Sequence, residues 1–86
     1  MVQVVTAGAG SVWLLAGKET WWGWKITYGD VWTFWANVVG TGEDDKTIEI
    51  TRVRSRRLGD KNYAILNLKN VGSQDALFVM YVARIF

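Results

Sequence analysis

The chain has 86 residues, half of them hydrophobic, with 6 Trp, 3 Tyr and 3 Phe and a formal net charge of +2. This length suits one domain spanning residues 1–86, and so weak a charge indicates no particular partner. The chain has no Cys and no His, which excludes disulfides and the common zinc sites and removes the usual general base and the best nucleophile of enzymes, so we expect a non-enzymatic protein without a cofactor.

The N-terminal segment, residues 1–11, lacks the basic region and the longer apolar stretch of a secretory signal. The longest apolar run, residues 76–83, is far shorter than the roughly 20 residues that a membrane helix requires. We therefore expect synthesis in the cytosol without a signal peptide. A membrane partner is not favoured, because the charged residues of the predicted strands would have to avoid lipid.

Seven strands are predicted from runs rich in Val, Ile, Thr and aromatic residues, separated by Gly, Asn and Asp. They cover residues 2–6, 11–15, 21–28, 31–39, 46–56, 62–70 and 76–86. No segment has sustained helical periodicity, and the connections are too short for parallel strand pairs. The sequence therefore predicts a small all-β, antiparallel β-sandwich, either immunoglobulin-like or jelly-roll-like, with a small barrel as the alternative.

Tryptophan is concentrated in residues 21–28 and 31–39, which are predicted to form a hairpin with rings side by side. Along the first of these strands Trp22 and Trp24 share one side, and Trp21 lies on the other. Such rings can fill the core, anchor a protein interface or, if exposed, stack on sugar rings. The candidate ligand-binding residues are Trp21, Trp22, Trp24 and Asp30.

Residues 46–56 alternate between polar and apolar until Val53, which falls on the wrong side and predicts a bulge near Thr51 and Arg52. Next to it, three arginines share one face about 7 Å apart. This row could pair with an acidic protein neighbour or with phosphates, or it could guard a solvated strand edge. Nucleic acid is not favoured, because the net charge is small and no known binding motif is present. The three are Arg52, Arg54 and Arg56.

The acidic run at residues 43–45 is the one segment with a composition that suits calcium. Its spacing matches no calcium-binding loop, and consecutive acids in a glycine-containing turn are normally solvated. We therefore expect no metal site.

The last predicted strand, residues 76–86, is apolar on both faces, and residues 31–39 behave similarly. A two-layer sandwich covers only one face of each sheet, so a second subunit or a ligand must cover the other, unless the strands close into a barrel. The predicted interface, including the arginine row, comprises Val31, Trp32, Phe34, Trp35, Phe78, Met80, Val82, Phe86, Arg52, Arg54 and Arg56.

Taken together, these patterns predict a structural protein that self-associates into a homo-oligomer or multi-copy assembly, such as a coat, shell or virion component. The alternative is a lectin-like module that binds carbohydrate through exposed tryptophans. Solution mass and the response of tryptophan fluorescence to sugars would separate these two predictions.

Overall fold

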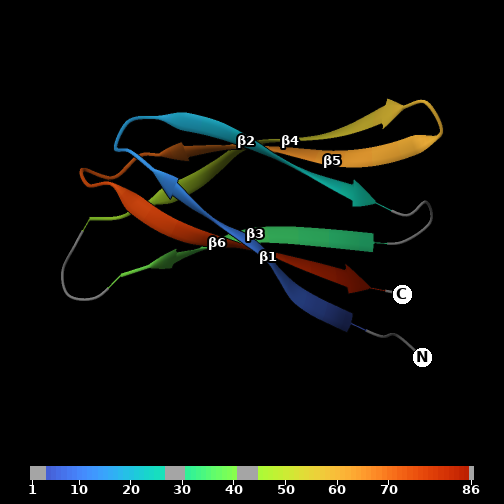
Figure 1. Ribbon diagram of the computed structural model, residues 1–86, viewed down its shortest axis with the longest axis horizontal. Coiled ribbons are helices and arrows are strands. Elements are labelled where there is room, and N and C mark those ends of the chain that lie inside the picture. The colour runs from blue at the N-terminus through green and yellow to red at the C-terminus, as the bar shows by residue number, and fades with distance from the viewer. Residues whose placement is uncertain (1–3, 27–30, 41–44, 86) are drawn as a thin grey trace.

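The computed structural model describes residues 4–26, 31–40 and 45–85. Within these ranges the chain forms six strands and no helix. The strands are β1 (Val4–Leu14), β2 (Glu19–Ile26), β3 (Val31–Val39), β4 (Ile48–Leu58), β5 (Lys61–Asn70) and β6 (Ala76–Ile85). Figure 1 shows them as two packed layers, which confirms the predicted all-β, antiparallel sandwich.

Each layer is a three-stranded antiparallel sheet. Sheet A has the order β1-β6-β3, and sheet B has the order β2-β5-β4. Only β4 and β5 are both consecutive in sequence and paired, so the other connections pass from one sheet to the other. The described strands thus form two separate sheets rather than the closed barrel that was the alternative.

The structure has six strands rather than the predicted seven, because residues 2–6 and 11–15 belong to one strand, β1. The glycine-rich segment between them continues the strand through a bulge, where the register with β6 shifts between Gly8 and Ser11. Gly10 has a φ of 112°, a conformation that glycine adopts without the steric penalty of a side chain.

The predicted hairpin between β2 and β3 is wrong, because β2 pairs with β5 and β3 pairs with β6. The tryptophans of these strands meet across the two layers instead. The ring centroids of Trp22 and Phe34 are 5.8 Å apart, and those of Trp24 and Trp32 are 6.4 Å apart. Trp22 and Trp24 also stack on each other within β2, at 5.6 Å. The two contacts between the layers hold the sheets together toward the end of the sandwich where β6 terminates, an end that can be located in Figure 1.

The two central strands, β5 and β6, supply most of the core. Their fully enclosed apolar side chains are Leu66, Leu68, Ala76, Phe78 and Met80. Val82 is also buried, so Phe78, Met80 and Val82, which were predicted to contact a partner, instead pack in the core of the chain itself. Trp32 and Phe34, also predicted to contact a partner, face the inside of the sandwich as well. β6 is apolar on both faces, as predicted, and sheet B covers the face that carries Val82.

Asn70, at the end of β5, is the one fully buried polar residue of the part of the chain described. Its side-chain amide donates to the carbonyl oxygens of Leu14 (3.0 Å) and Gln74 (2.8 Å), and its Oδ1 accepts from the N–H of Gly72 (3.0 Å). Its backbone N–H and C=O both bond to the turn between β1 and β2. One side chain therefore ties two connections of the sandwich together, and its buried polar atoms are satisfied.

Candidate functional site

The outer face of sheet A consists of side chains that point away from sheet B. In register across the three strands, these form four rows: Trp13, Leu77 and Val39; Ser11, Val79 and Asn37; Gly8, Tyr81 and Trp35; and Ala83 with Thr33. Trp13 is 60% exposed, and the Trp35 ring stacks on Tyr81 with centroids 5.5 Å apart. The four rows carry no charged side chain, so the accessible surface here is aromatic, aliphatic or neutral.

Only one residue of the strands of sheet A is charged, and that is Arg84. It lies on the inward side of β6, where its guanidinium carbon is 5.8 Å from the centroid of the Trp32 ring. This contact is a cation–π interaction inside the sandwich. Even the single cation of this sheet is thus directed away from its outer face.

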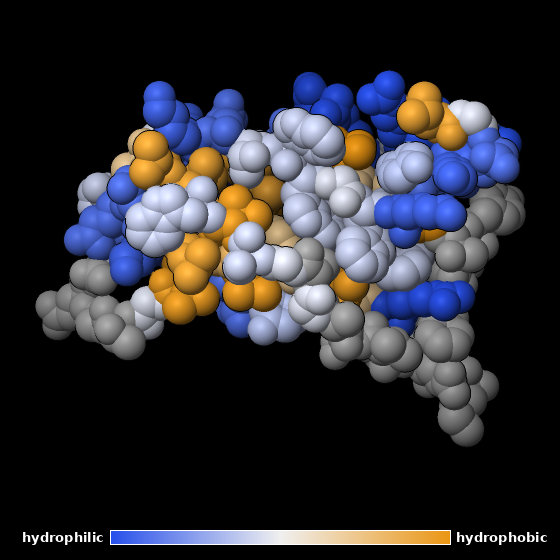
Figure 2. All heavy atoms as spheres, in the orientation of Figure 1, coloured by the Kyte–Doolittle hydropathy of each residue, from blue (hydrophilic) through white to orange (hydrophobic). Residues whose placement is uncertain are grey.

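The outer face of sheet B has a different composition. Its cross-strand rows are Glu19, Lys69 and Glu49; Trp21, Asn67 and Arg52; Gly23, Ile65 and Arg54; and Lys25, Tyr63 and Arg56. The two acids are in the first row, next to the connections, and the other three rows carry four cations and no acid. Figure 2 shows hydrophilic side chains gathered along the margin of the molecule where β4 lies.

The bulge predicted in β4 is confirmed, because the register with β5 shifts between Ile50 and Arg52. The shift puts Val53 on the inward side and aligns the arginine row on the outer face, as the sequence indicated. Residues 51–58 are nevertheless exposed on both sides of the strand, and Val53 is 64% exposed. This half of the edge strand is thus exposed on its inward side as well as on the outer face that carries the arginine row.

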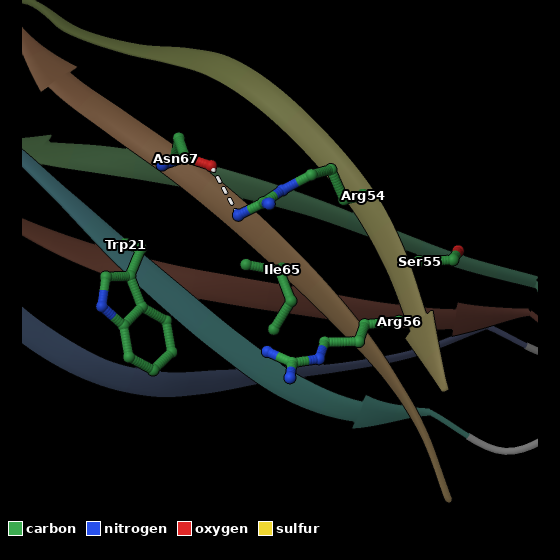
Figure 3. Close-up of a pocket in the computed structure, with 6 residues that line it drawn as sticks. All are labelled: Trp21, Arg54, Ser55, Arg56, Ile65 and Asn67. Atoms are coloured by element: carbon green, nitrogen blue, oxygen red, sulfur yellow. Dashed lines mark hydrogen bonds between the residues drawn. The ribbon is translucent and has the colours of Figure 1, made fainter. Parts of the chain in front are cut away.

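Two adjoining hollows lie on the outer face of sheet B. The first has a volume of about 340 Å³ and is lined by Trp21, Arg54, Ser55, Arg56, Ile65 and Asn67. The second has a volume of about 280 Å³ and is lined by Trp21, Gly23, Arg56, Leu58, Tyr63 and Ile65. Figure 3 shows Arg54 and Arg56 extending from β4 across β5, toward the strand that carries Trp21. The shared residues make the two hollows one continuous depression across the sheet.

Trp21 is 67% exposed and forms the aromatic wall of this depression. Its orientation depends on Gly23, because a Cβ at that position would lie 3.4 Å from the Trp21 ring and 3.3 Å from Ile65. The glycine allows the indole to lie along the strand. On the opposite wall, Arg54 Nη2 donates to Asn67 Oδ1 at 3.3 Å, which orients one guanidinium group over the hollow.

The other tryptophans predicted to bind a ligand do not line this depression. Trp22 and Trp24 face the interior of the sandwich, as does Trp32. The indole N–H groups of Trp24 and Trp32 are buried, with no hydrogen-bond acceptor among the described residues. Asp30 and Phe86 lie outside the described residues, and Val31 is placed only through its backbone pairing with Ile85.

Two of the described acids accept hydrogen bonds from backbone N–H groups in the connections between strands. Asp45 Oδ2 accepts from the N–H of Ser73 at 3.2 Å, and Asp75 Oδ1 accepts from the N–H of Ala16 at 2.9 Å. Across the described ranges, no three Asp or Glu side chains are grouped closely enough to hold a metal ion. Residues 43 and 44 of the acidic run lie outside those ranges. The described part of the chain also has no helix of the length and apolarity needed to cross a membrane.

Sequence reasoning missed the residues of β5 that complete the depression, which are Tyr63, Ile65 and Asn67. Their shared parity in the run of residues 62–70 was a usable signal for one outward face. What was missing was the pairing of β5 with both β2 and β4, which brings Trp21 to the arginine row. No family model, curated protein or solved structure matches the chain significantly.

Proposed function

We propose that this protein is a non-enzymatic structural building block that self-associates through the outer face of sheet A. The observation that carries the proposal is the absence of charge from that face in the described rows, together with its exposed Trp13 and Trp35. Monomers rarely leave a contiguous apolar surface uncovered, and Trp and Tyr are the usual anchors of protein interfaces. A second copy of the chain brings an equally neutral surface, so no charge is buried by the contact.

The edge strands of the two sheets also support a second copy of the chain as the partner. β1 and β3 each pair only with β6, and neither contains a charged residue or a proline. The edge strands of sheet B, β2 and β4, carry charged side chains on their exposed sides. Proteins normally use charges to prevent edge strands from pairing with other chains. Sheet B has this protection and sheet A does not, as expected for a sheet that meets other copies.

The size of the face indicates how copies meet. Three strands about 4.8 Å apart, with ten residues rising about 3.3 Å each, present a surface on the order of 500 Å². A stable interface buries about 800 Å² on each partner. Packing of this face onto one other copy would therefore bury too little surface for a stable interface. We expect the contact to extend along the edges of β1 and β3 to further copies.

The strand orders support the jelly-roll-like alternative over the immunoglobulin-like one. In immunoglobulin-like sheets several consecutive strands are neighbours. Here β1 pairs with β6 in one sheet and β2 pairs with β5 in the other, as in a long antiparallel ribbon rolled into two layers. Jelly rolls are common in viral coat and lectin domains. By analogy with these folds, we propose that the assembly is a coat, a shell or part of a virion.

The lectin-like alternative depends on Trp21, because Trp22 and Trp24 face inward. A neutral sugar presents hydroxyl groups that need both donors and acceptors, commonly carboxylates and amides. Three of the side chains lining the depression, Trp21, Arg54 and Arg56, can only donate, and none is a carboxylate. The acceptors are two hydroxyl groups and the Asn67 amide oxygen, which already accepts from Arg54. These contacts favour the building block over a neutral-sugar lectin.

The proposal is tested by the native mass of the purified chain, measured by sedimentation over a range of concentrations. We expect a mass well above 9.7 kDa, and we expect Val79→Asp to reduce it to that of a monomer. Asp at this position would put a charge at the centre of the neutral face, where its desolvation costs several kcal/mol on association.

Val53→Asp is the matched control, because Val53 is exposed, belongs to β4 of sheet B and is not part of the outer face of sheet A. It should leave the native mass unchanged, and both variants should keep a β-sheet circular dichroism spectrum. A monodisperse wild-type monomer at every concentration would refute self-association.

A further inference from the structure

We propose that the depression on the outer face of sheet B binds single-stranded nucleic acid, with a base stacked on Trp21 and phosphates held by Arg54 and Arg56. The structural basis is the juxtaposition of an exposed indole with two guanidinium groups over one continuous hollow. This inference is independent of self-association, because it uses the opposite face of the molecule.

The electrostatics of the face favour a polyanion. The three rows over which the depression lies contain Lys25, Arg52, Arg54 and Arg56. They contain no acid, because Glu19 and Glu49 flank Lys69 in the row at the other end of the sheet. The net charge of +2 for the whole chain therefore conceals a local concentration of four cations. Arg54 and Arg56 line the depression itself, and the other two cations lie in the same rows.

The aromatic groups distinguish nucleic acid from an acidic peptide. Single-stranded nucleic acids are bound by positively charged grooves whose aromatic side chains stack on successive bases. Trp21 and Tyr63 lie on neighbouring strands and both line the second hollow, with Ile65 between the two hollows. The acidic side chains of a peptide could pair with the arginines, but they have no aromatic ring to stack on the indole. A flat sheet face with aromatic and basic side chains is also how several RNA-binding folds present their binding surface.

The spacing of the arginines suits a polymer rather than a single small anion. Alternate residues of a strand are about 7 Å apart, so the row offers cations at regular intervals along β4. Arg56 and Trp21 line both hollows, so two adjacent nucleotides could share them. The volumes of about 340 and 280 Å³ lie just above and just below the lower limit of about 300 Å³ for ligand sites. Each hollow thus accommodates one unit of a chain that continues across the sheet.

The experiment is fluorescence polarisation of the full chain with a fluorescein-labelled oligothymidylate of about ten nucleotides, a length within the usual site sizes. We expect binding that weakens as salt rises, because counterions are released when phosphates are neutralised. Trp21→Ala should weaken binding about five-fold or more, since it removes base stacking. Arg54→Ala and Arg56→Ala should each lower the slope of log affinity against log salt by about 0.7.

Val71→Ala and Arg57→Ala are the matched controls. Val71 is an exposed apolar residue in the connection between β5 and β6, and Arg57 is on β4 with its side chain on the opposite side of the strand from the row. Both variants should bind as the wild type does. Equal loss in Val71→Ala and Trp21→Ala would overturn the proposal, as would failure of the wild type to bind at low salt.

Competition identifies the class of polyanion. A poly-glutamate peptide and a heparin oligosaccharide, each at the same charge concentration as the oligonucleotide, should displace it less effectively than unlabelled oligothymidylate does. If either one binds more tightly than oligothymidylate and loses affinity equally in Trp21→Ala, the depression is a site for that polyanion and the nucleic-acid proposal is wrong.

Discussion

The outer faces of the two sheets differ in charge, although both sheets have three antiparallel strands of similar length. Sheet A presents neutral rows anchored by Trp13 and Trp35, and sheet B presents four cations around Trp21. In both cases an exposed tryptophan is the largest apolar group, but its neighbours determine which partner it suits. Surrounded by neutral groups, the ring suits an apolar protein surface; surrounded by guanidinium groups, it suits an anion with a flat face.

The difference also explains how a chain with so little net charge can have two surfaces of opposite character. The charged residues are concentrated in β2, β4 and β5, and the strands of sheet A contain one. Because consecutive strands mostly alternate between the sheets, this separation requires the charge pattern to alternate along the chain as well. It is therefore a property of the fold and the sequence together, and each surface can be altered without changing the other.

The largest effect is expected from Val82→Asp, which tests whether β6 has one covered face or two. Val82 is buried against sheet B, so an aspartate there would be an unpaired charge in the core. The cost of several kcal/mol is comparable with the whole stability of a small domain, about 5–15 kcal/mol. We expect loss of cooperative thermal unfolding, measured by circular dichroism. Val79→Asp, three positions away on the neutral face, should unfold cooperatively; similar behaviour of the two variants would mean that the two faces are not distinct.

The next largest effect is expected from Asn70→Ala, which tests what holds the two sheets at one end. The substitution removes three side-chain hydrogen bonds and leaves the buried carbonyl of Leu14 without its donor. We expect the free energy of unfolding, measured in urea, to be about 2–4 kcal/mol lower than that of the wild type. Ser73→Ala is the control, because Ser73 is exposed in the same connection and uses only its backbone N–H. A change of less than about 0.5 kcal/mol in Asn70→Ala would show that packing alone fixes this end.

The sequence could predict which face of its own strand each side chain occupies. Alternation within β4 placed the bulge at Thr51 and the arginine row on one face, and alternation within β2 separated Trp21 from Trp22 and Trp24. These properties follow from the two-residue period of a single strand. They need no knowledge of which strand lies alongside.

Pairing could not be predicted, because it depends on contacts between distant parts of the chain. The expected hairpin would pair β2 with β3, which are adjacent in sequence. In the structure each of them pairs with a strand much further along the chain. The same nonlocal pairing brings Trp21 to Arg54 and Arg56 and buries Phe78, Met80 and Val82 within the protomer. Asn70 gave no signal at all, because its role depends on two turns that meet only in the folded chain.

The smallest effect on folding is expected from Arg54→Glu, and this substitution separates the two faces most directly. Arg54 is exposed and makes a single side-chain hydrogen bond, at 3.3 Å to Asn67, so the stability should change by no more than about 0.5 kcal/mol. Oligothymidylate binding should fall further than in Arg54→Ala, because the new carboxylate repels phosphate. The native mass should stay that of the wild type, since sheet A is unaltered. If the mass falls instead, the arginine row contacts acids of a neighbouring copy, and sheet B belongs to the assembly surface rather than to a separate binding site.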